Sequence, residues 1–80
     1  MSSKLHVAGL NWQTSDERLG AVFAARGTVT DARVMRDRRT GRSRGYGYVT
    51  FSTPEEALGA LEALHETTLD GWTIRVEEAR

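Results

Sequence analysis

The sequence predicts a two-layer α+β sandwich in the order βαββαβ, with two helices covering one face of a four-stranded antiparallel sheet. Short stretches that alternate apolar and polar residues, as half-buried strands do, are interrupted by two stretches with apolar residues at helical spacing. Each helical stretch also begins with residues typical of a helix N-cap. A chain of 80 residues can bury one modest core, so we expect a single domain over residues 4–79.

The first predicted strand and helix occupy the N-terminal third of the chain. Leu5 and Val7 alternate with polar or small neighbours, and the strand is expected to end near Gly9. Residues 14–17, Thr-Ser-Asp-Glu, read as a capping box with Thr14 as the N-cap. The apolar stripe of the helix follows, and Gly27 is expected to stop the helix.

Two further strands are predicted on either side of an arginine-rich turn. Val29, Ala32 and Val34 form the apolar side of the second strand, and the uneven spacing after Val29 suggests a β-bulge. The turn contains Thr40-Gly41, where glycine favours a chain reversal. Residues 46–51 are rich in aromatic and β-branched residues and form the third strand.

The second helix and the last strand complete the order. Thr53 is the predicted N-cap, and Pro54 occupies the first helical position, where its missing N–H costs nothing. Residues 69–71, Leu-Asp-Gly, predict a turn. The final strand is expected over residues 73–77, with Ile74 and Val76 on its buried side.

This order splits into two βαβ-like halves, which indicates the ferredoxin-like arrangement with both helices on one sheet face. The other face stays open to solvent. Because strand side chains alternate, Val49 and Phe51 should face the helices, while Tyr46 and Tyr48 should point to water. The same alternation places these residues on the open face: His6, Ala8, Arg33, Met35, Arg75 and Glu77.

The charge pattern agrees with a binding role for that face. The formal net charge is zero, yet five of the ten arginines lie within residues 36–44, where Asp37 is the one opposing acid. Aromatic faces beside a cluster of arginines suit single-stranded nucleic acid, because bases stack on rings and phosphates pair with guanidinium groups. The chain has no cysteine, so thiolate chemistry and cysteine zinc sites are excluded, and we expect no cofactor.

Residues 44–51, Arg-Gly-Tyr-Gly-Tyr-Val-Thr-Phe, resemble the octamer of the RNA recognition motif family, with a conservative tyrosine at Tyr48 where the pattern has phenylalanine. The resemblance extends over residues 4–79 and implies an RNA-binding domain of the predicted fold. By this resemblance Tyr48 and His6 each stack a base, Tyr46 packs against a ribose, and Arg44 bridges a phosphate. The candidate RNA-binding residues are His6, Tyr46, Tyr48, Arg44, Arg33, Arg42, Arg39, Arg75, Glu77, Met35 and Lys4.

The chain departs from the family in the first strand, at residues 5–10. His6 stands where a larger aromatic ring usually stacks, and Gly9 stands at the usual asparagine position. Imidazole is a smaller platform than phenol or phenyl, so we expect weaker binding or an altered preference at that nucleotide.

Other functions and partners stay open from the residues alone. The partner is expected to be single-stranded RNA, with single-stranded DNA as a further possibility because base stacking serves both. A protein-interaction module on the same fold is the alternative, suggested by Trp12 and Trp72, and protein partners are possible. An enzyme is not expected, because no histidine pairs with a nucleophile and no glycine-rich phosphate loop precedes a helix.

The start of the chain, residues 1–4, is not followed by an apolar run long enough for a signal peptide or a membrane span. We therefore expect an intracellular monomer of the nucleus or cytoplasm, with no membrane partner.

Overall fold

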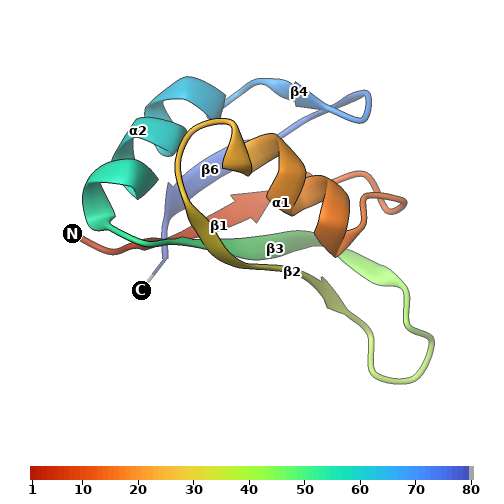
Figure 1. Cartoon of the computed structure of the whole chain (residues 1–80). Coiled ribbons are helices and arrows are strands. Elements are labelled where there is room, and N and C mark those ends of the chain that lie inside the picture. The colour runs from red at the N-terminus through yellow and green to blue at the C-terminus, as the bar shows by residue number, and fades with distance from the viewer. Residues whose placement is uncertain (80) are drawn as a thin grey trace.

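The computed structural model describes residues 1–79 and contains two helices and six strands. In chain order these are β1 (Lys4–Ala8), α1 (Asp16–Ala24), β2 (Val29–Arg36), β3 (Ser43–Phe51), α2 (Pro54–Leu64), β4 (Thr68–Leu69), β5 (Trp72–Thr73) and β6 (Arg75–Glu78). Four strands form an antiparallel sheet in the order β2-β3-β1-β6. Both helices lie on one face of this sheet, and the other face is uncovered (Figure 1). The predicted ferredoxin-like fold is confirmed.

The core lies between the helices and the sheet. It joins apolar residues of both layers, which are Leu5, Val7, Leu10, Leu19, Phe23, Val34, Val49, Phe51, Ala57, Ala60, Leu69, Ile74 and Val76. The rings of Phe23 in α1 and Phe51 in β3 lie 6.5 Å apart, which ties the first helix to a central strand. The two central strands therefore present one side to the core and leave the other side free.

Strand β3 pairs with β1 on one side and with β2 on the other, and it lies very close to β2 at Gly47. This glycine lies opposite Val7 of β1 and Val34 of β2. A β-carbon added to Gly47 would lie 2.3 Å from the carbonyl oxygen of Arg33. The strand spacing at this point therefore depends on the absence of a side chain.

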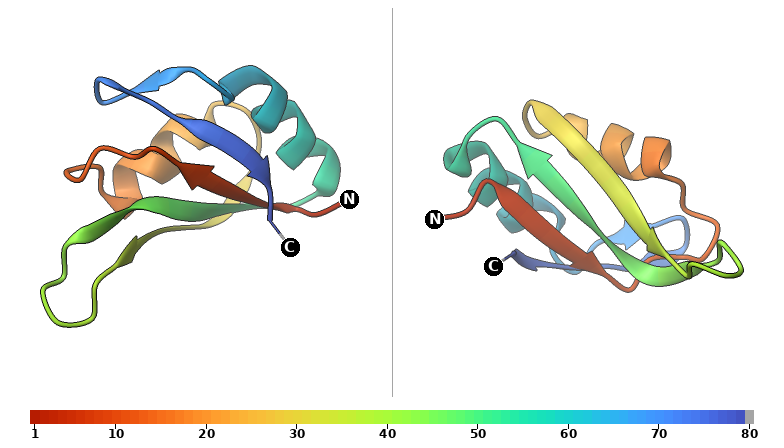
Figure 2. Two further views of the ribbon diagram at one scale, coloured as in Figure 1. Left: turned by 180° about the vertical axis from the view of Figure 1, so that it is seen from behind. Right: turned by 90° about the horizontal axis from the view of Figure 1, so that it is seen from below.

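The bulge predicted in the second strand is confirmed. The register between β2 and β3 shifts between Val29 and Asp31, and it shifts again between Val34 and Arg36. The second shift lies where the strands leave the main sheet and enter the hairpin that projects from its end (Figure 2). Bulges increase local twist, which suits a hairpin that bends away from the helices.

The first helix begins differently from the prediction. Ser15, rather than Thr14, is the N-cap, and its hydroxyl accepts a hydrogen bond from the amide of Arg18. Thr14 is fully buried, and its hydroxyl donates to Oδ2 of Asp70 at 2.8 Å. The predicted capping box is wrong because a partner far along the chain, in the β4–β5 turn, takes the threonine hydroxyl.

The first helix also ends at Ala24, before the predicted stop at Gly27. Gly27 instead lies against α2, where an added β-carbon would meet Cβ of Glu56 at 3.0 Å. Glu56 accepts the amide of Thr28 at 2.9 Å, and this bond joins the α1–β2 turn to the first turn of α2. The glycine thus permits close packing between these two segments.

The second helix begins as predicted. Thr53 is the N-cap and accepts from the amide of Glu56, and Pro54 occupies the first turn. The predicted last strand is split, because Thr73 pairs with Thr68 in a separate two-stranded hairpin and β6 starts only at Arg75. The hairpin turn, Asp70-Gly71, has positive φ at both residues (50° and 84°), as a type I′ turn requires.

Candidate nucleic-acid interface

The open face of the sheet is centred on β1 and β3. In the antiparallel register Lys4 lies opposite Thr50, His6 opposite Tyr48, and Ala8 opposite Tyr46. The alternate residues of both strands are buried beneath the helices. The predicted division of the third strand into core-facing and solvent-facing residues is therefore found in the structure.

Three aromatic rings from these strands form one contiguous cluster. The ring centroid of His6 lies 5.3 Å from that of Tyr46 and 5.3 Å from that of Tyr48. The two tyrosine rings lie 6.1 Å apart at 85°, so one presents its edge to the other. Nζ of Lys4 lies 4.7 Å from the centroid of Tyr48, within the range of a cation–π contact. The cluster combines π-faces with a positive charge.

His6 is held more tightly than a free stacking platform would be. Its side chain is 26% exposed, and its Nδ1 atom lies 3.4 Å from Oε1 of Glu77 on the neighbouring strand β6. That nitrogen is buried and makes no hydrogen bond within residues 1–79. The imidazole ring therefore packs between the two tyrosines and strand β6, and only part of it is exposed on the surface.

The flanking strands contribute charge on both sides of the rings. Arg33 of β2 lies opposite Tyr48, and its Nε atom is 3.5 Å from Oδ2 of Asp31. Arg75 of β6 lies opposite Ala8 and is exposed. Met35 is half-buried on β2. The structure brings Arg33 and Arg75 to the two borders of the ring cluster.

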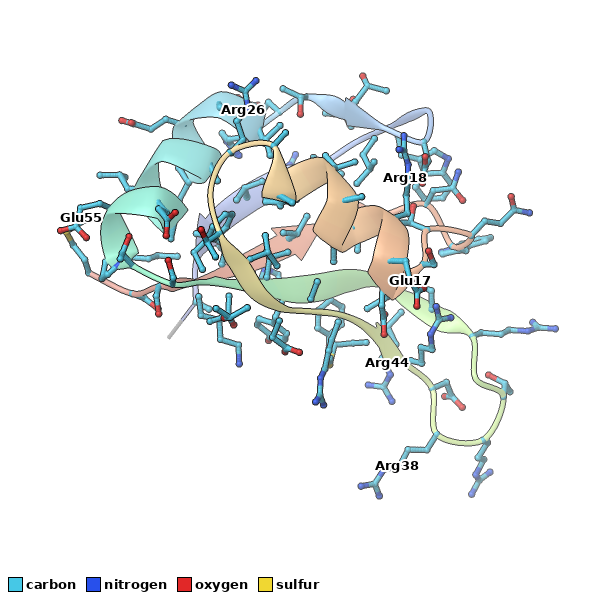
Figure 3. The ribbon with its side chains drawn as sticks, viewed as in Figure 1. Glu17, Arg18, Arg26, Arg38, Arg44 and Glu55 are labelled. Carbon is cyan, nitrogen blue, oxygen red and sulfur yellow. The ribbon has the colours of Figure 1, made fainter. Side chains whose placement is uncertain are left out.

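The β2–β3 hairpin carries the remaining predicted arginines, Arg39, Arg42 and Arg44, and also Arg38. Arg38 is near its tip, and Arg44 lies on the helix-free side where β3 enters the sheet (Figure 3). Arg39 and Arg42 are exposed in the same hairpin. These arginines lie beyond one end of the ring cluster rather than around it.

Asp37 organises that hairpin. Its Oδ1 atom accepts the amides of Arg39 at 2.8 Å and Thr40 at 3.1 Å, and its own amide donates to the carbonyl of Arg42 at 2.8 Å. The hydrogen bonds from the backbone of Thr40 and of Arg39 hold the pKa of Asp37 below its usual value. The carboxylate of Asp37 therefore binds backbone amides of its own hairpin, and the arginine side chains lie around it.

One contact near the interface had no signal in the sequence. Trp12, in the β1–α1 loop, and Trp72, in β5, suggested the protein-interaction alternative separately, and their ring centroids lie 5.6 Å apart at 61°. They are 60 residues apart in the chain, so only the fold brings them together.

The described part of the chain contains neither a metal-binding cluster nor a membrane-spanning helix. Among residues 1–79, no group of three or more histidine, cysteine or acidic residues could hold a metal ion. Within the same range, no helix is long and apolar enough to cross a membrane.

Comparisons with known proteins agree with the geometry. The model of the RNA recognition motif family matches residues 5–75. The chain is 51% identical over 79 residues to glycine-rich RNA-binding protein 1 of Mycosarcoma maydis, covering 99% of this chain and 45% of that protein. It is 48% identical over 79 residues to the mitochondrial glycine-rich RNA-binding protein 4 of Arabidopsis thaliana, covering 99% of this chain and 58% of that protein. The chain thus spans about half the length of the curated relatives it matches.

Two solved structures show the same agreement in three dimensions. The second RRM domain of the yeast poly(U)-binding protein superposes with a TM-score of 0.90 at 34% identity, covering 96% of this chain and 93% of that one. A structure described as a Sxl-lethal protein/RNA complex superposes with a TM-score of 0.94 at 32% identity, covering all of this chain and 48% of that one. Sequence, fold and octamer together show that this chain belongs to the RNA recognition motif family.

Proposed function

We propose that this domain binds single-stranded RNA on the open face of its sheet. The observation that carries the proposal is the cluster of His6, Tyr46 and Tyr48, whose ring centroids lie within 5.3 to 6.1 Å of one another. Arginines lie at the borders of this cluster on β2 and β6, and beyond one end of it in the β2–β3 hairpin. Rings for bases and guanidinium groups for phosphates are the two requirements of a single-stranded ligand.

The residues divide the work according to their positions. Tyr48 stacks one base, His6 offers a smaller platform for a second, and Tyr46 packs against a ribose. Arg44, at the end of β3, pairs with a backbone phosphate. Arg33 and Arg75 act at the borders of the face, while Arg39 and Arg42 supply attraction from the hairpin.

The smaller residues of the face have supporting roles. Lys4 gives up its position over the Tyr48 ring and turns to a phosphate when a base arrives. Met35 offers apolar contact beside Arg33, and Glu77 fixes His6 and offers its carboxylate to base amino groups. Stacking is worth about 1 to 3 kcal/mol per base. Stacking on the rings should therefore account for most of the affinity that remains at high salt, where phosphate contacts are weakened.

The relatives support RNA as the ligand, because the names of those from Mycosarcoma maydis and Arabidopsis describe RNA-binding proteins. We infer a binding module of residues 4–79 that acts as a monomer, rather than an enzyme. The proposed setting is intracellular. The names of relatives from Arabidopsis and Nicotiana sylvestris specify mitochondria and chloroplasts, so organelles join the nucleus and cytoplasm as compartments for this domain.

The test is a titration of pools of short random RNA and DNA against the wild type and a Tyr46→Ala, Tyr48→Ala double variant. We expect the double variant to lose about 10- to 100-fold in RNA affinity, because two ring contacts are removed. A Leu58→Ala variant is the matched control, since Leu58 is an exposed apolar residue on α2, on the opposite side of the sheet.

Unchanged RNA affinity in the double variant would overturn the proposal. Equal affinity for RNA and DNA would retain the single-stranded face but remove RNA as its preferred ligand, because only RNA offers 2′-hydroxyl contacts. If neither the RNA pool nor the DNA pool binds the wild type or the variants, the protein-interaction alternative is favoured.

A further inference from the structure

A hollow of about 540 Å³ lies beyond the end of the open face, between the β1–α1 loop and the β2–β3 hairpin. It is lined by Trp12, Gln13, Arg36, Arg42 and Ser43. One large aromatic ring, two guanidinium groups and two neutral polar side chains are the chemistry that a single nucleotide requires.

The ring of Trp12 is available to a ligand. Its side chain lies on the surface, and the residue is 68% exposed. Its contact with Trp72 is edge-on, at 61° and 5.6 Å, so the neighbour supports the ring without covering both of its faces. An indole held in this way can accept a stacked base on its free side.

The loop that carries Trp12 is fixed in place by the β4–β5 turn. Nδ2 of Asn11 donates to the carbonyl of Asp70 at 2.9 Å, and the buried Thr14 hydroxyl donates to the carboxylate of the same residue at 2.8 Å. Nε of Arg18 donates to the other carboxylate oxygen at 3.0 Å. These bonds hold both tryptophan-bearing segments together before any ligand binds, which lowers the ordering cost of binding.

The hollow lies beside the end of β3 that leads into the ring cluster. The amide of Leu10 donates to the carbonyl of Gly45 at 2.8 Å, which joins the start of the β1–α1 loop to β3 directly before Tyr46. A β-carbon added to Gly45 would lie 3.9 Å from Nε1 of Trp12. We therefore expect a strand that crosses Tyr48 and Tyr46 and continues towards the start of β3 to come next to Trp12.

The charge of the hollow also fits a phosphate. Arg42 lines it from the hairpin, and Nη1 of Arg36 donates to the carbonyl of Gly41 at 3.2 Å, which fixes that guanidinium group at the rim. The nearest acid in the hairpin, Asp37, is bound by the loop amides of Arg39 and Thr40.

We propose that Trp12 is an additional base-stacking platform outside the sheet, and that Arg36 and Arg42 bind the phosphate of the same nucleotide. This inference rests on the proposed RNA-binding face and extends it by one nucleotide. It assigns Trp12 and Trp72 to nucleic-acid binding rather than to protein docking, with Trp72 as the positioning residue.

The test uses a series of oligouridylates from about two to about eight nucleotides, which have little structure of their own. For wild type we expect affinity to rise when the strand becomes long enough to pass the tyrosines and reach Trp12. Trp12→Ala should lower the affinity for the longest strand by about tenfold and that for the shortest by less than about twofold. Trp12→Phe, which keeps a ring, should recover most of the loss.

A second readout follows the indole N–H signals by NMR, assigned with Trp12→Phe and Trp72→Phe. The Trp12 signal should move with long strands only. Arg42→Gln should reduce the slope of log affinity against log salt by about 0.7 for the long strand, as the loss of one phosphate contact predicts. Arg26→Gln is the matched control, because Arg26 lies on the helix side of the molecule (Figure 3).

The outcomes separate this inference from the proposed function. If Tyr48→Ala weakens strands of every length while Trp12→Ala weakens none, the Trp12 platform is wrong and the sheet face stands. If Tyr48→Ala has no effect at any length, the proposed function itself fails. An unmoved Trp12 signal with long RNA would return this tryptophan pair to the protein-docking alternative.

Discussion

Nζ of Lys4 lies 4.7 Å from the ring centroid of Tyr48, so a lysine occupies part of the surface on which a base is proposed to stack. A cation over a phenol ring is stabilised by the ring quadrupole by about 0.5 to 1 kcal/mol at an exposed site. An RNA strand offers the base for the ring and the phosphate for the lysine. In the proposed mode of binding, one weak internal contact is exchanged for two contacts with the RNA.

Substitution of Lys4 should separate these two effects. Lys4→Gln uncovers the Tyr48 ring but removes a phosphate partner, so we expect less than about a threefold change in affinity near physiological salt. The slope of log affinity against log salt should fall by about 0.7, since one phosphate contact is lost. Anisotropy titrations at several salt concentrations measure both quantities. An unchanged slope would mean that Lys4 remains on the ring in the complex.

Gly47 and Gly59 should respond in opposite ways to alanine. A β-carbon at Gly47 would lie 2.3 Å from the carbonyl oxygen of Arg33, so β2 must move, and the free energy of unfolding should fall by about 1 to 3 kcal/mol. The octamer pattern accepts alanine at this position, so the variant should still fold. At Gly59, in α2, an added β-carbon meets no atom of residues 1–79 within 4 Å other than those of its chain neighbours and of the adjacent helix backbone.

Gly59→Ala should therefore raise the free energy of unfolding by about 0.5 to 1 kcal/mol, because glycine is unfavourable inside a helix. Urea denaturation of both variants measures the two changes in the free energy of unfolding. A Gly47→Ala protein as stable as wild type would contradict the close approach of β2 and β3.

The alternation of strand residues was sufficient to predict which side chains face the helices and which lie on the open face. Val49 and Phe51 are buried and Tyr46 and Tyr48 are not, because a sheet covered on one side sorts side chains with a period of two. The bulge after Val29 could be predicted for the same reason, since it interrupts that period. The fold class follows from such local patterns.

Contacts between distant residues could not be predicted in this way. Thr14 and Ser15 are both good N-caps, and only the position of Asp70 in the folded protein decides that Thr14 turns inward. The β4–β5 hairpin was missed because strands of two residues are too short to show alternation. The pairing of Trp12 with Trp72 depends on both of these features, and it could not be predicted without them.

Asp70 gives the domain a stability that depends on pH. The hydrogen bond from Thr14 and then that from Arg18 hold the pKa of Asp70 below its ordinary value of 3.8. A carboxyl whose pKa is lowered on folding stabilises the protein above that ordinary value, and this contribution is lost as the pH falls through the folded-state pKa. The ionised carboxylate of Asp70 should therefore stabilise the fold most at neutral pH.

Asp70→Asn is a close test, because asparagine keeps the shape and also tolerates the positive φ of 50° at this position. We expect its Tm to lie below that of wild type at neutral pH and the difference to shrink as the pH falls below 3.8. Asp37 and Glu56 also have lowered pKa values, but they titrate in both proteins and so cancel in the difference. A Tm difference that is constant from neutral to acidic pH would contradict this role of the carboxylate.

His6 is the residue whose replacement should improve the domain. Its Nδ1 atom is buried without a hydrogen bond in residues 1–79, and its ring is a smaller platform than those of the neighbouring tyrosines. His6→Phe removes a buried nitrogen that makes no hydrogen bond in the described part of the chain, although Oε1 of Glu77 lies 3.4 Å away, and it widens the π-face. RNA affinity should therefore rise by about threefold or more and Tm should increase. Calorimetric titration and thermal unfolding measure the two effects.

His6→Leu distinguishes stacking from simple removal of the polar atom. Leucine also removes the nitrogen, so it should share part of the gain in Tm, but it has no π-face and should bind RNA more weakly than wild type. If His6→Phe and His6→Leu bind RNA equally well, no base stacks at this position. His6 would then only pack against Tyr46 and Tyr48 and set the angle between their rings. The stacking surface of this domain would consist of the two tyrosines alone.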